Sequence, residues 1–457
     1  MELKLIEKDG IDFAIDEYGA LQFILNEIKQ AKVIIPHKFS SGEVINTIAE
    51  GFYFKGSGTV SDIYISDGIT TIAQSAFEGQ KVSSFRWPGT CPIIPKRCFL
   101  NCDIEKLSHI ENVTVIEKEA FKGAAIEDMA DVENVEIVGI AAFKGAFIKS
   151  FTWPSKCSKI PNFCFSKSSI ERISNIENVE SIQKCAFSDT KLEEITWPSK
   201  CKKIPSHCFD GCHNLKLVSN IDNVEQVEEG AFYNTRIERF EWPSACGTIP
   251  KYCFLNSWIE EITNINKVTV IEESAFEGAK IKKIIWPDNC KTIPQYCFYE
   301  SELKEISNIE NVEHIELRAF EHCMIDTFIW PPKCTTIPRF CFCDTRIKGI
   351  YNIGNVETIG EGAFCNTKHL STFAWPLGCT AIPEKCFLGS SIRKIHNLWN
   401  VQAIGARAFA ETDNLKTVDL SGILTCRIDP SAFHGKEPDA IIPPFYDDIR
   451  IVQNLDV

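Results

Sequence analysis

Hydrophobic residues recur along this chain with a period of about 22 residues. The dipeptides Ala-Phe and Cys-Phe mark the period best, because they return at steps of 22, with occasional steps of 23 and one of 24. They begin at seventeen positions, namely residues 76, 98, 120, 142, 164, 186, 208, 231, 253, 275, 297, 319, 341, 363, 386, 408 and 432. A fixed period of this length indicates one repeat array.

Two consecutive repeat units, which we call rungs, show the apolar positions. They read IERISNIENVESIQKCAFSDT (residues 170–190) and LEEITWPSKCKKIPSHCFDGC (residues 192–212). Numbered from the first aliphatic residue, positions 1, 4, 6, 10, 13, 17 and 18 are mostly apolar or small. The alternation at positions 4, 5 and 6 predicts a short strand. A single rung is too short to bury a core, so stacked rungs must share one, as in a solenoid.

The rungs resemble the leucine-rich repeats of the BspA-like family, whose unit reads roughly L-x-x-I-x-I-P-x-x-V-x-x-I-G-x-x-A-F-x-x-C. The resemblance covers about residues 33–434 and includes a degenerate first rung at residues 33–54. It implies a leucine-rich-repeat solenoid of the α/β repeat class, with short parallel strands and a mostly irregular or short helical convex side. It also implies a single elongated curved domain. Family members are mostly surface or secreted proteins implicated in adhesion, which implies a protein ligand such as a host matrix or cell-surface protein.

Three segments are expected along the chain. Residues 1–32 are predicted to form an N-terminal capping meander, because EKDG and DEYG indicate turns. Residues 33–434 form the repeat array of about 17–18 rungs, and residues 435–457 a C-terminal cap with apolar clusters around Pro443-Pro444. Caps are expected because a solenoid otherwise exposes its core and its strand edges at both ends.

The rungs are of two alternating types, so the full period is 44 residues. The first type has Trp-Pro at positions 6 and 7, with tryptophans at Trp87, Trp153, Trp197, Trp242, Trp286, Trp330 and Trp375. The second type has Asn at position 6, at Asn175, Asn220, Asn264, Asn308, Asn352 and Asn397, or His109 and Asp131 in two early rungs. We expect the indoles to be buried, with the Asn amide of the next rung as the acceptor for each indole N–H. The alternative is an exposed tryptophan stripe that binds a partner.

Fourteen of the 21 cysteines occupy positions 10 and 17 of the Trp-Pro rungs. The same positions hold Val and Ala in the other rungs, for example Val179 and Ala186. Because free cysteine behaves as a small hydrophobic residue, we predict that these thiols are buried, reduced and metal-free. Cys102, Cys212 and Cys323 match the late cysteine of the family unit at position 21. Cys343 and Cys365 follow at position 19 and are expected to be more exposed.

Nothing in the sequence has the pattern of a catalytic or cofactor site. P-loop, G-x-G-x-x-G, H-E-x-x-H and G-x-S-x-G motifs are absent. Carboxylate pairs such as Glu260-Glu261 are interpreted as part of a solvated face, and neither His396 nor His322 has a partner that the repeat would gather. We therefore predict no enzyme activity, no cofactor and no metal. The net charge of -14 disfavours nucleic acid as a partner.

The sequence gives conflicting indications of the cellular compartment. No apolar run approaches the ~18 residues of a membrane span, and the N-terminal residues lack the pattern of a signal peptide. Many unpaired thiols suit a reducing cytoplasm or an anaerobic habitat. The family resemblance instead implies a surface or secreted location, and the oligomeric state is left open.

Position 5 of each strand should point away from the core, and its residues change along the array. The N-terminal half of this column is mostly small and polar, whereas the C-terminal half has Ile285, Ile329, Tyr351 and His396, with open space at Gly349. We predict that these four residues form a partner-binding patch on the strand face. Chance variation, the convex side and the caps remain as alternatives. The leading function is a non-enzymatic, adhesin-like protein-binding solenoid, and the alternative is an intracellular scaffold or host-directed effector.

Overall fold

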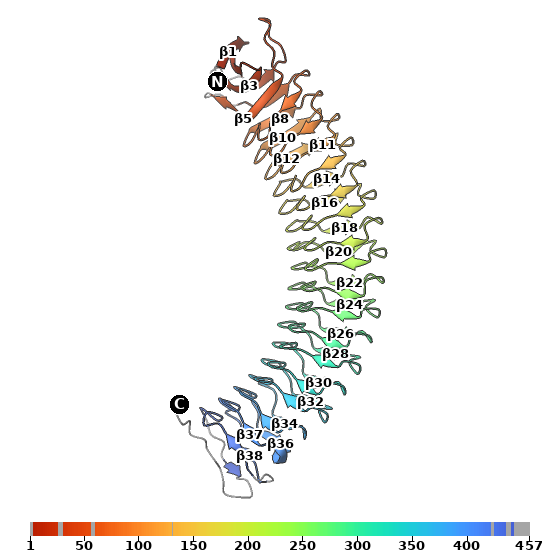
Figure 1. Cartoon of the computed structure of the whole chain (residues 1–457), viewed down its shortest axis with the longest axis vertical. Coiled ribbons are helices and arrows are strands. Elements are labelled where there is room, and N and C mark those ends of the chain that lie inside the picture. Colours follow the sequence, from red (N-terminus) through yellow and green to blue (C-terminus); the bar gives the residue numbers. More distant parts are fainter. Residues whose placement is uncertain are drawn as a thin grey trace. The chain divides into compact units, whose positions relative to one another are not determined.

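The computed structural model of this chain describes residues 3–25, 31–55, 60–129, 131–421, 425–435 and 440–442. Successive rungs stack through parallel strands, with the strand of each rung on one side and its turns on the other (Figure 1). In the described part of the chain the only helix is η1, a 3₁₀ turn at Leu398–Asn400. The predicted leucine-rich-repeat solenoid is therefore confirmed, and its connecting segments are turns and two-residue strands rather than helices.

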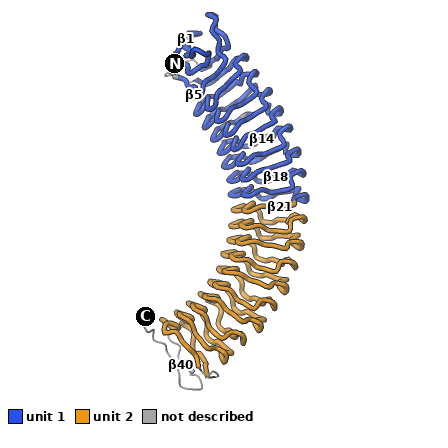
Figure 2. The backbone as a smooth tube through the Cα atoms, viewed as in Figure 1, with its two compact units in different colours: residues 1–224 blue, residues 225–457 orange. Residues whose placement is uncertain are grey.

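The chain divides into two compact units, residues 1–224 and residues 225–457 (Figure 2). This division falls inside the predicted repeat array, and each unit contains rungs of both types. The segment boundaries after residues 32 and 434 stay predictions.

Two rows of short parallel strands, which we call ladders, run through each unit, and from β14 to β33 each hydrogen-bonded sheet within them has two strands. The first ladder uses the strand near positions 3–5, as predicted. In the first unit its strands are β4 (Lys32–Ile35), β6 (Asp62–Ile65), β8 (Lys81–Arg86), β10 (Asp103–Ser108), β12 (Ala125–Met129), β14 (Ser150–Thr152), β16 (Arg172–Ser174), β18 (Glu194–Thr196) and β20 (Leu217–Ser219). In the second unit they are β22 (Arg239–Glu241), β24 (Glu261–Thr263), β26 (Lys283–Ile285), β28 (Glu305–Ser307), β30 (Thr327–Ile329), β32 (Gly349–Tyr351), β34 (Thr372–Ala374), β36 (Lys394–His396), β38 (Thr417–Asp419) and β40 (Ala440–Ile442).

The second ladder mostly consists of two-residue strands at positions 12 and 13. In the first unit these are β5 (Thr47–Lys55, which is longer), β7 (Thr71–Ile72), β9 (Ile93–Ile94), β11 (Val115–Ile116), β13 (Ile137–Val138), β15 (Lys159–Ile160), β17 (Ser181–Ile182) and β19 (Lys203–Ile204). In the second unit they are β21 (Gln226–Val227), β23 (Thr248–Ile249), β25 (Val270–Ile271), β27 (Thr292–Ile293), β29 (His314–Ile315), β31 (Thr336–Ile337), β33 (Thr358–Ile359), β35 (Ala381–Ile382), β37 (Ala403–Ile404) and β39 (Arg427–Ile428). Equivalent residues of paired rungs face each other, as Ile284 faces Ile306.

The two ends of the chain add strands to these ladders. Strands β1 (Leu3–Lys8), β2 (Ile11–Asp16) and β3 (Ala20–Leu25) pair antiparallel in sequence order, and β3 then pairs parallel with β5. At the other end β40 pairs parallel with β38. The rest of the expected C-terminal cap, including Pro443-Pro444, lies outside the described residues.

A column of phenylalanine rings from position 18 forms the centre of each unit. The rings of Phe121 and Phe143 lie 5.3 Å apart and within 1° of parallel, and those of Phe298 and Phe320 lie 5.8 Å apart and within 3°. All four side chains are fully buried. Because each ring contacts one above and one below, the rungs share a continuous apolar core that no single rung could form.

The tryptophans of the Trp-Pro rungs are buried, as predicted, but their hydrogen bonds differ from the prediction. The indole Nε1 of Trp197 donates to the carbonyl oxygen of Cys201 in its own rung, at 3.1 Å, and the other six tryptophans of this type do the same. The Asn amide is a donor instead: Asn220 Nδ2 lies 2.7 Å from the backbone oxygen of Trp197. The expected indole-to-amide bond was therefore wrong.

The backbone explains why Asn occupies position 6. Asn220 has a φ of 59°, and the other position-6 residues of this rung type are also left-handed. Asn and Asp tolerate this conformation better than other residues with a side chain. His109 and Asp131, the two early exceptions, adopt it as well, with φ of 64° and 66°.

Candidate protein-binding surface

The outward column at position 5 begins with hydroxyl groups. In the first unit the side chains of Thr152, Ser174, Thr196 and Ser219 lie on neighbouring strands. The Ser174 hydroxyl lies 3.3 Å from that of Thr152, and the Ser219 hydroxyl lies 3.4 Å from that of Thr196. At position 5 this part of the strand face is polar, although Leu217 at position 3 of β20 is 50% exposed.

In the second unit the same column becomes apolar. Ile285, Ile329 and Tyr351 keep 70%, 67% and 59% of their surface exposed, and His396 is also exposed. Tyr351 lies directly opposite Ile329 across the β30–β32 pair. Ile285 and His396 lie farther along the column, next to Ser307 and Ala374. The strand-face patch, as we call Ile285, Ile329, Tyr351 and His396, thus has a compact centre and two outlying members.

Tyr351 fills the space that Gly349 leaves on the same strand. A Cβ atom at Gly349 would lie 3.1 Å from the Tyr351 hydroxyl oxygen, so the ring lies back over the glycine. The open space expected at Gly349 is therefore occupied by the patch itself. The absence of a side chain at Gly349 leaves room for the aromatic ring over the strand.

Two hollows adjoin the patch. One has a volume of about 990 Å³ and is lined by Ile262, Thr263 and Ile285 among others. The other has a volume of about 700 Å³ and includes Ile306 and Ile329. Their floors lie at Asn-type rungs, where Ile262 and Ile306 are only half-buried. The exposed isoleucines of the Trp-Pro rungs therefore alternate with hollows in the Asn-type rungs.

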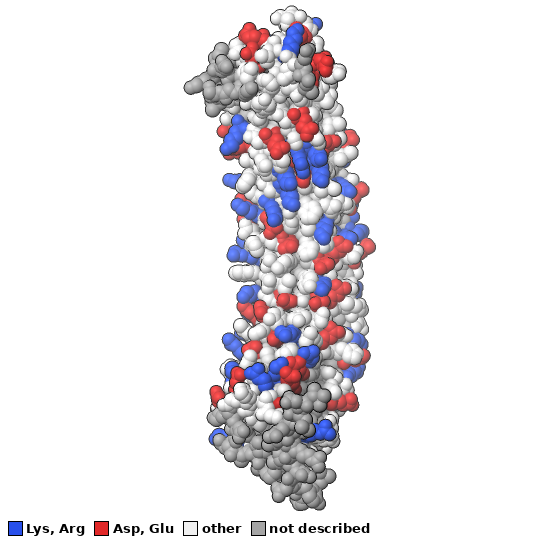
Figure 3. Space-filling model, turned by 60° about the vertical axis from the view of Figure 1, so that its left-hand side comes forward, with Lys and Arg blue, Asp and Glu red and all other residues white. Residues whose placement is uncertain are grey.

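Charged side chains around the hollows pair with one another between rungs. Lys282 lies 2.8 Å from Glu260, which it hydrogen-bonds, and this bond lowers the pKa of Glu260. Arg239 pairs with Glu261 at 3.5 Å. Each carboxylate of the Glu260-Glu261 pair thus has its own cation, which supports the interpretation as a solvated face. Basic and acidic groups also lie side by side on the face seen in Figure 3.

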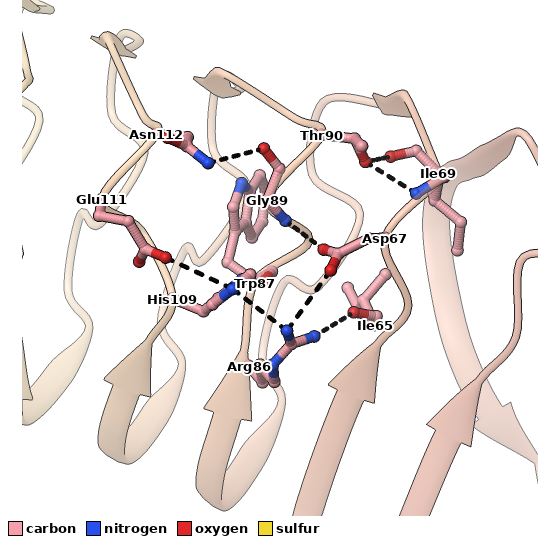
Figure 4. Close-up of polar contacts among 11 residues, drawn as sticks. Ile65, Asp67, Ile69, Arg86, Trp87, Gly89, Thr90, His109, Glu111 and Asn112 are labelled. Atoms are coloured by element: carbon pink, nitrogen blue, oxygen red, sulfur yellow. Dashed lines mark hydrogen bonds and ion pairs between the residues drawn. The ribbon is translucent and has the colours of Figure 1, made fainter.

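A polar network occupies the strand face of the first unit, where Arg86 lies between Asp67 and His109 (Figure 4). Arg86 Nη2 lies 3.1 Å from His109 Nε2 and 3.6 Å from Asp67 Oδ2. His109 Nδ1 lies 2.9 Å from the carbonyl oxygen of Trp87. Glu111 Oε1 lies 3.4 Å from the same His109 Nε2. His109 thus replaces the usual Asn donor to the tryptophan carbonyl.

The Asp67 carboxylate is fixed from two sides. The amide of Gly89 donates to Asp67 Oδ1 at 2.7 Å, and this bond, with the nearby Arg86, lowers the pKa of Asp67. This network was not predicted from the sequence. Its signal was Arg86, a basic residue in a column that is otherwise mostly small and polar in the first unit.

Several exposed aromatic side chains lie away from the strand-face patch. They are Phe147, Trp258 and Trp399, with 64%, 45% and 52% of their surface exposed. The guanidinium of Arg236 stacks over the Trp258 ring at 4.8 Å. Within the described residues no helix combines the length and the hydropathy that a membrane span needs.

A model of the BspA type leucine rich repeat region matches residues 46–171, 136–259, 225–348 and 318–438. The chain belongs to the BspA-type leucine-rich-repeat family. Proteins with such repeats typically bind other proteins. Among curated proteins none is a significant match.

Solved structures of other leucine-rich repeat proteins are similar to this chain over most of its length. A leucine-rich repeat protein from Bacteroides ovatus is 19% identical, with 92% of this chain and 93% of that chain covered and a TM-score of 0.52. A leucine rich cell surface protein from Faecalibacterium prausnitzii is 17% identical over 97% and 96% of the two chains, with a TM-score of 0.28. The pneumococcal vaccine antigen PcpA is 15% identical over 96% and 98%, with a TM-score of 0.33. Of the three, the Bacteroides protein superposes closely enough to show a shared fold.

The family pattern also accounts for most cysteines. All fourteen at positions 10 and 17 are buried and free of disulfides, as predicted. Burial raises their pKa, to about 11 for Cys91 for example, so these thiols are poor nucleophiles. They fill core positions where other rungs of the family unit use Val and Ala.

The cysteines at position 19 depart from the prediction. Cys343 and Cys365 form a disulfide with a Cα–Cα distance of 4.6 Å, and both are buried rather than more exposed. The repeat itself causes this, because equivalent residues of neighbouring rungs lie within disulfide range. The expectation that His322 has no partner was also wrong, because its Nε2 atom lies 4.0 Å from Asp344 Oδ2 in the next rung.

Proposed function

We propose that this chain is a non-enzymatic, adhesin-like protein-binding solenoid, and that it contacts a host or partner protein through the strand-face patch. The observation that carries the proposal is the exposure of Ile285, Ile329 and Tyr351 at position 5, a position that hydroxyl side chains occupy in much of the first unit. Apolar and aromatic groups that lose water on contact dominate interface energies.

The alternation of exposed isoleucines and hollows on this surface supports the same proposal. Side chains of a partner would enter the two hollows beside Ile285 and Ile329, while these isoleucines pack into the partner. The Lys283–Glu305 pair, at 2.7 Å, and its neighbours neutralise the rim. Affinity would then depend mainly on apolar burial, and it would change little with salt concentration.

Two substitutions in the patch test this function against a matched control. Tyr351→Ala and Ile329→Ala should each weaken binding to a purified host matrix protein by ~1–3 kcal/mol, measured by surface plasmon resonance over a panel of such proteins. The control is Thr196→Ala. Thr196 occupies position 5 in the polar half, so this substitution should leave the affinity unchanged. If a bound matrix protein has equal affinity for all four chains, the patch is rejected and the turns or the ends of the array become the candidates.

A second function, an intracellular scaffold or host-directed effector with the same binding mode, is favoured by the nineteen free cysteines. Unpaired thiols in this number suit a reducing compartment. Protease digestion of intact native cells separates the two functions. An adhesin loses its signal on immunoblots of protease-treated cells, whereas a scaffold inside the cell keeps it.

A further inference from the structure

Three successive turns of the second unit place six metal-binding or hydrogen-bonding side chains in two adjacent columns. Position 19 holds Glu321, Cys343 and Cys365, and position 20 holds His322, Asp344 and Asn366. In the described part of the chain no other neighbouring turns both have cysteine at position 19. This set lies on the turns that follow the phenylalanine column, away from the strand face.

The backbone fixes these turns against one another. The amide of His322 donates to the carbonyl oxygen of Cys343, and the amide of Asp344 donates to that of Cys365, both at 2.9 Å. His322 and Asp344 both have left-handed backbones, with φ of 61° and 57°. The side chains therefore start from a frame that is set by the stacking of rungs.

Four potential ligand atoms converge around the Asp344 carboxylate. Asp344 Oδ2 lies 3.4 Å from the Cys343 sulfur and 4.0 Å from His322 Nε2. The Cys365 sulfur is bonded to the Cys343 sulfur. Neighbouring ligands of a tetrahedral Zn²⁺ are about 3.3–3.8 Å apart, given bonds of about 2.0–2.3 Å. The separation of Asp344 from the Cys343 sulfur is within that range, and its separation from His322 is slightly longer.

We propose that reduction of the Cys343–Cys365 disulfide creates a binding site for one divalent cation of the Zn²⁺ class, with Cys343, Cys365, His322 and Asp344 as ligands. Two thiolates, one imidazole and one carboxylate are a donor set that suits Zn²⁺. Asn366 Nδ2, 3.3 Å from Asp344 Oδ2, holds the carboxylate from outside. This site departs from the sequence-based expectation of no metal, which considered neither His322 nor the position-19 cysteines as ligands.

Glu321 completes the surroundings but is not needed as a ligand. Arg318 binds its carboxylate at 2.8 Å, and the Glu321 side chain is 6% exposed. The ligand atoms of Glu321, His322 and Asp344 nevertheless lie within 4.8 Å of one another. His322 and Asp344 are 40% and 34% exposed, which gives a cation a path from solvent.

The two states of the site exclude each other. A dithiol reductant transfers two electrons and two protons to the disulfide, which gives two thiols and leaves the reductant as its own disulfide. The cation then replaces the two thiol protons, which are released to water. A sulfur atom that is bonded to another sulfur is no thiolate ligand, so the oxidised chain lacks half of the donor set.

The repeat supplies substitutions that the fold already accepts. Position 19 is Ser at residues 166 and 188, and position 20 is Asn at residues 101, 234 and 256. Cys343→Ser, Cys365→Ser, His322→Asn and Asp344→Asn therefore remove ligands without a new backbone demand. Cys323→Ala is the matched control, because it changes a thiol in the same turn as His322 to the Ala found at residues 124 and 279.

The test uses the full chain and Co²⁺, which shows thiolate coordination by its charge-transfer absorption. The reduced wild type and Cys323→Ala should bind one equivalent of Co²⁺ with this absorption, and Zn²⁺ should displace it. The four ligand variants should weaken binding by more than the about 10–100-fold typical of an outer-shell change. The disulfide form should not show the absorption. Charge transfer that is absent in the reduced wild type, unchanged in Cys343→Ser, or equally strong in the disulfide form would overturn the proposal.

Discussion

At the scale of single residues, backbone conformation decides more than side-chain pairing. Asn at position 6 was expected to accept from an indole, but it is needed because the chain is left-handed there. Its amide then donates to the tryptophan carbonyl of the preceding rung, as Asn264 does to Trp242 at 2.8 Å. The residue type was therefore visible in the sequence, whereas its role depended on a φ angle that the apolar pattern does not contain.

Asn220 offers a test that separates these two contributions. Asn220→Ala should lower the free energy of unfolding by ~2 kcal/mol, because it adds the left-handed penalty of ~1–2 kcal/mol to the loss of one hydrogen bond. Asn220→Gly keeps the backbone free to be left-handed and should cost about 1 kcal/mol. Urea unfolding followed by circular dichroism measures both. Equal losses in the two variants would show that conformation is not the reason for Asn.

The core cysteines should be replaceable by the residues that other rungs use. Cys297 is fully buried and lies between rungs that have Ala275 and Ala319 at the same position. Cys297→Ala should therefore cost less than about 1.5 kcal/mol, near the limit for well-tolerated core changes. Phe298→Ala, its neighbour in the ring column, should cost ~3–5 kcal/mol. Urea midpoints of the two variants give the comparison, and similar losses would contradict it.

At the scale of elements, the sequence predicted the strand at positions 3–5 because apolar and polar residues alternate there. The second ladder, such as β27 at Thr292–Ile293, was missed because two residues give no alternation to detect. The disulfide had a visible signal, since Cys343 and Cys365 are one period apart while most other repeated cysteines are two apart. His322 and Asp344 have the same spacing. Residues at the same position in neighbouring rungs lie in contact. The contacts of Cys343 with Cys365 and of His322 with Asp344 could therefore have been predicted from their spacing.

Ion pairs between rungs predict a pH dependence of stability. Lys385 hydrogen-bonds Glu361 at 2.9 Å, and this bond, with help from Arg339, lowers the pKa of Glu361. The folded pKa thus lies below the unfolded value of about 4.3, so the stabilisation is present above that pH and is lost as the pH falls through the folded pKa. Glu361→Gln should be about 1 kcal/mol less stable than wild type at neutral pH.

The difference between wild type and Glu361→Gln should shrink as the pH falls below about 4. Urea unfolding at a series of pH values measures it. Glu260→Gln is the comparison: the pKa of Glu260 is also lowered by a lysine, but both partners are more exposed, so solvent screening should make its difference from wild type smaller. A difference for Glu361→Gln that stays constant down to low pH would exclude the pairing as its cause.

At the scale of the whole molecule, the unit of the repeat is a pair of rungs. No two Trp-Pro rungs are neighbours in the sequence, whereas two rungs of the second type, with His109 and Asp131, are. Each buried indole occupies space next to a rung that has a smaller residue at position 6. The chain therefore tolerates a missing tryptophan but has no example of two in succession.

Internal deletions should show this difference. Removal of residues 153–196 takes out one rung of each type and joins Thr152 to Trp197, which keeps the order of rungs. Removal of residues 175–196 takes out only an Asn-type rung and places the rungs of Trp153 and Trp197 together. We expect the first variant to unfold cooperatively like wild type and the shorter deletion to lose several kcal/mol, the scale of an overpacked core with a lost hydrogen bond. Thermal unfolding of the two deletion variants and the wild type measures this difference.

The buried indoles also give the molecule an optical signature. Within each unit the tryptophans of alternate rungs are about 10 Å apart, twice the strand spacing, and have almost the same surroundings. Because these indoles are buried, the emission of the folded chain should be blue-shifted. Iodide should quench only Trp258 and Trp399, the two exposed indoles. Unfolding of either unit should then shift the emission to longer wavelengths, so the tryptophan fluorescence reports unfolding without a label.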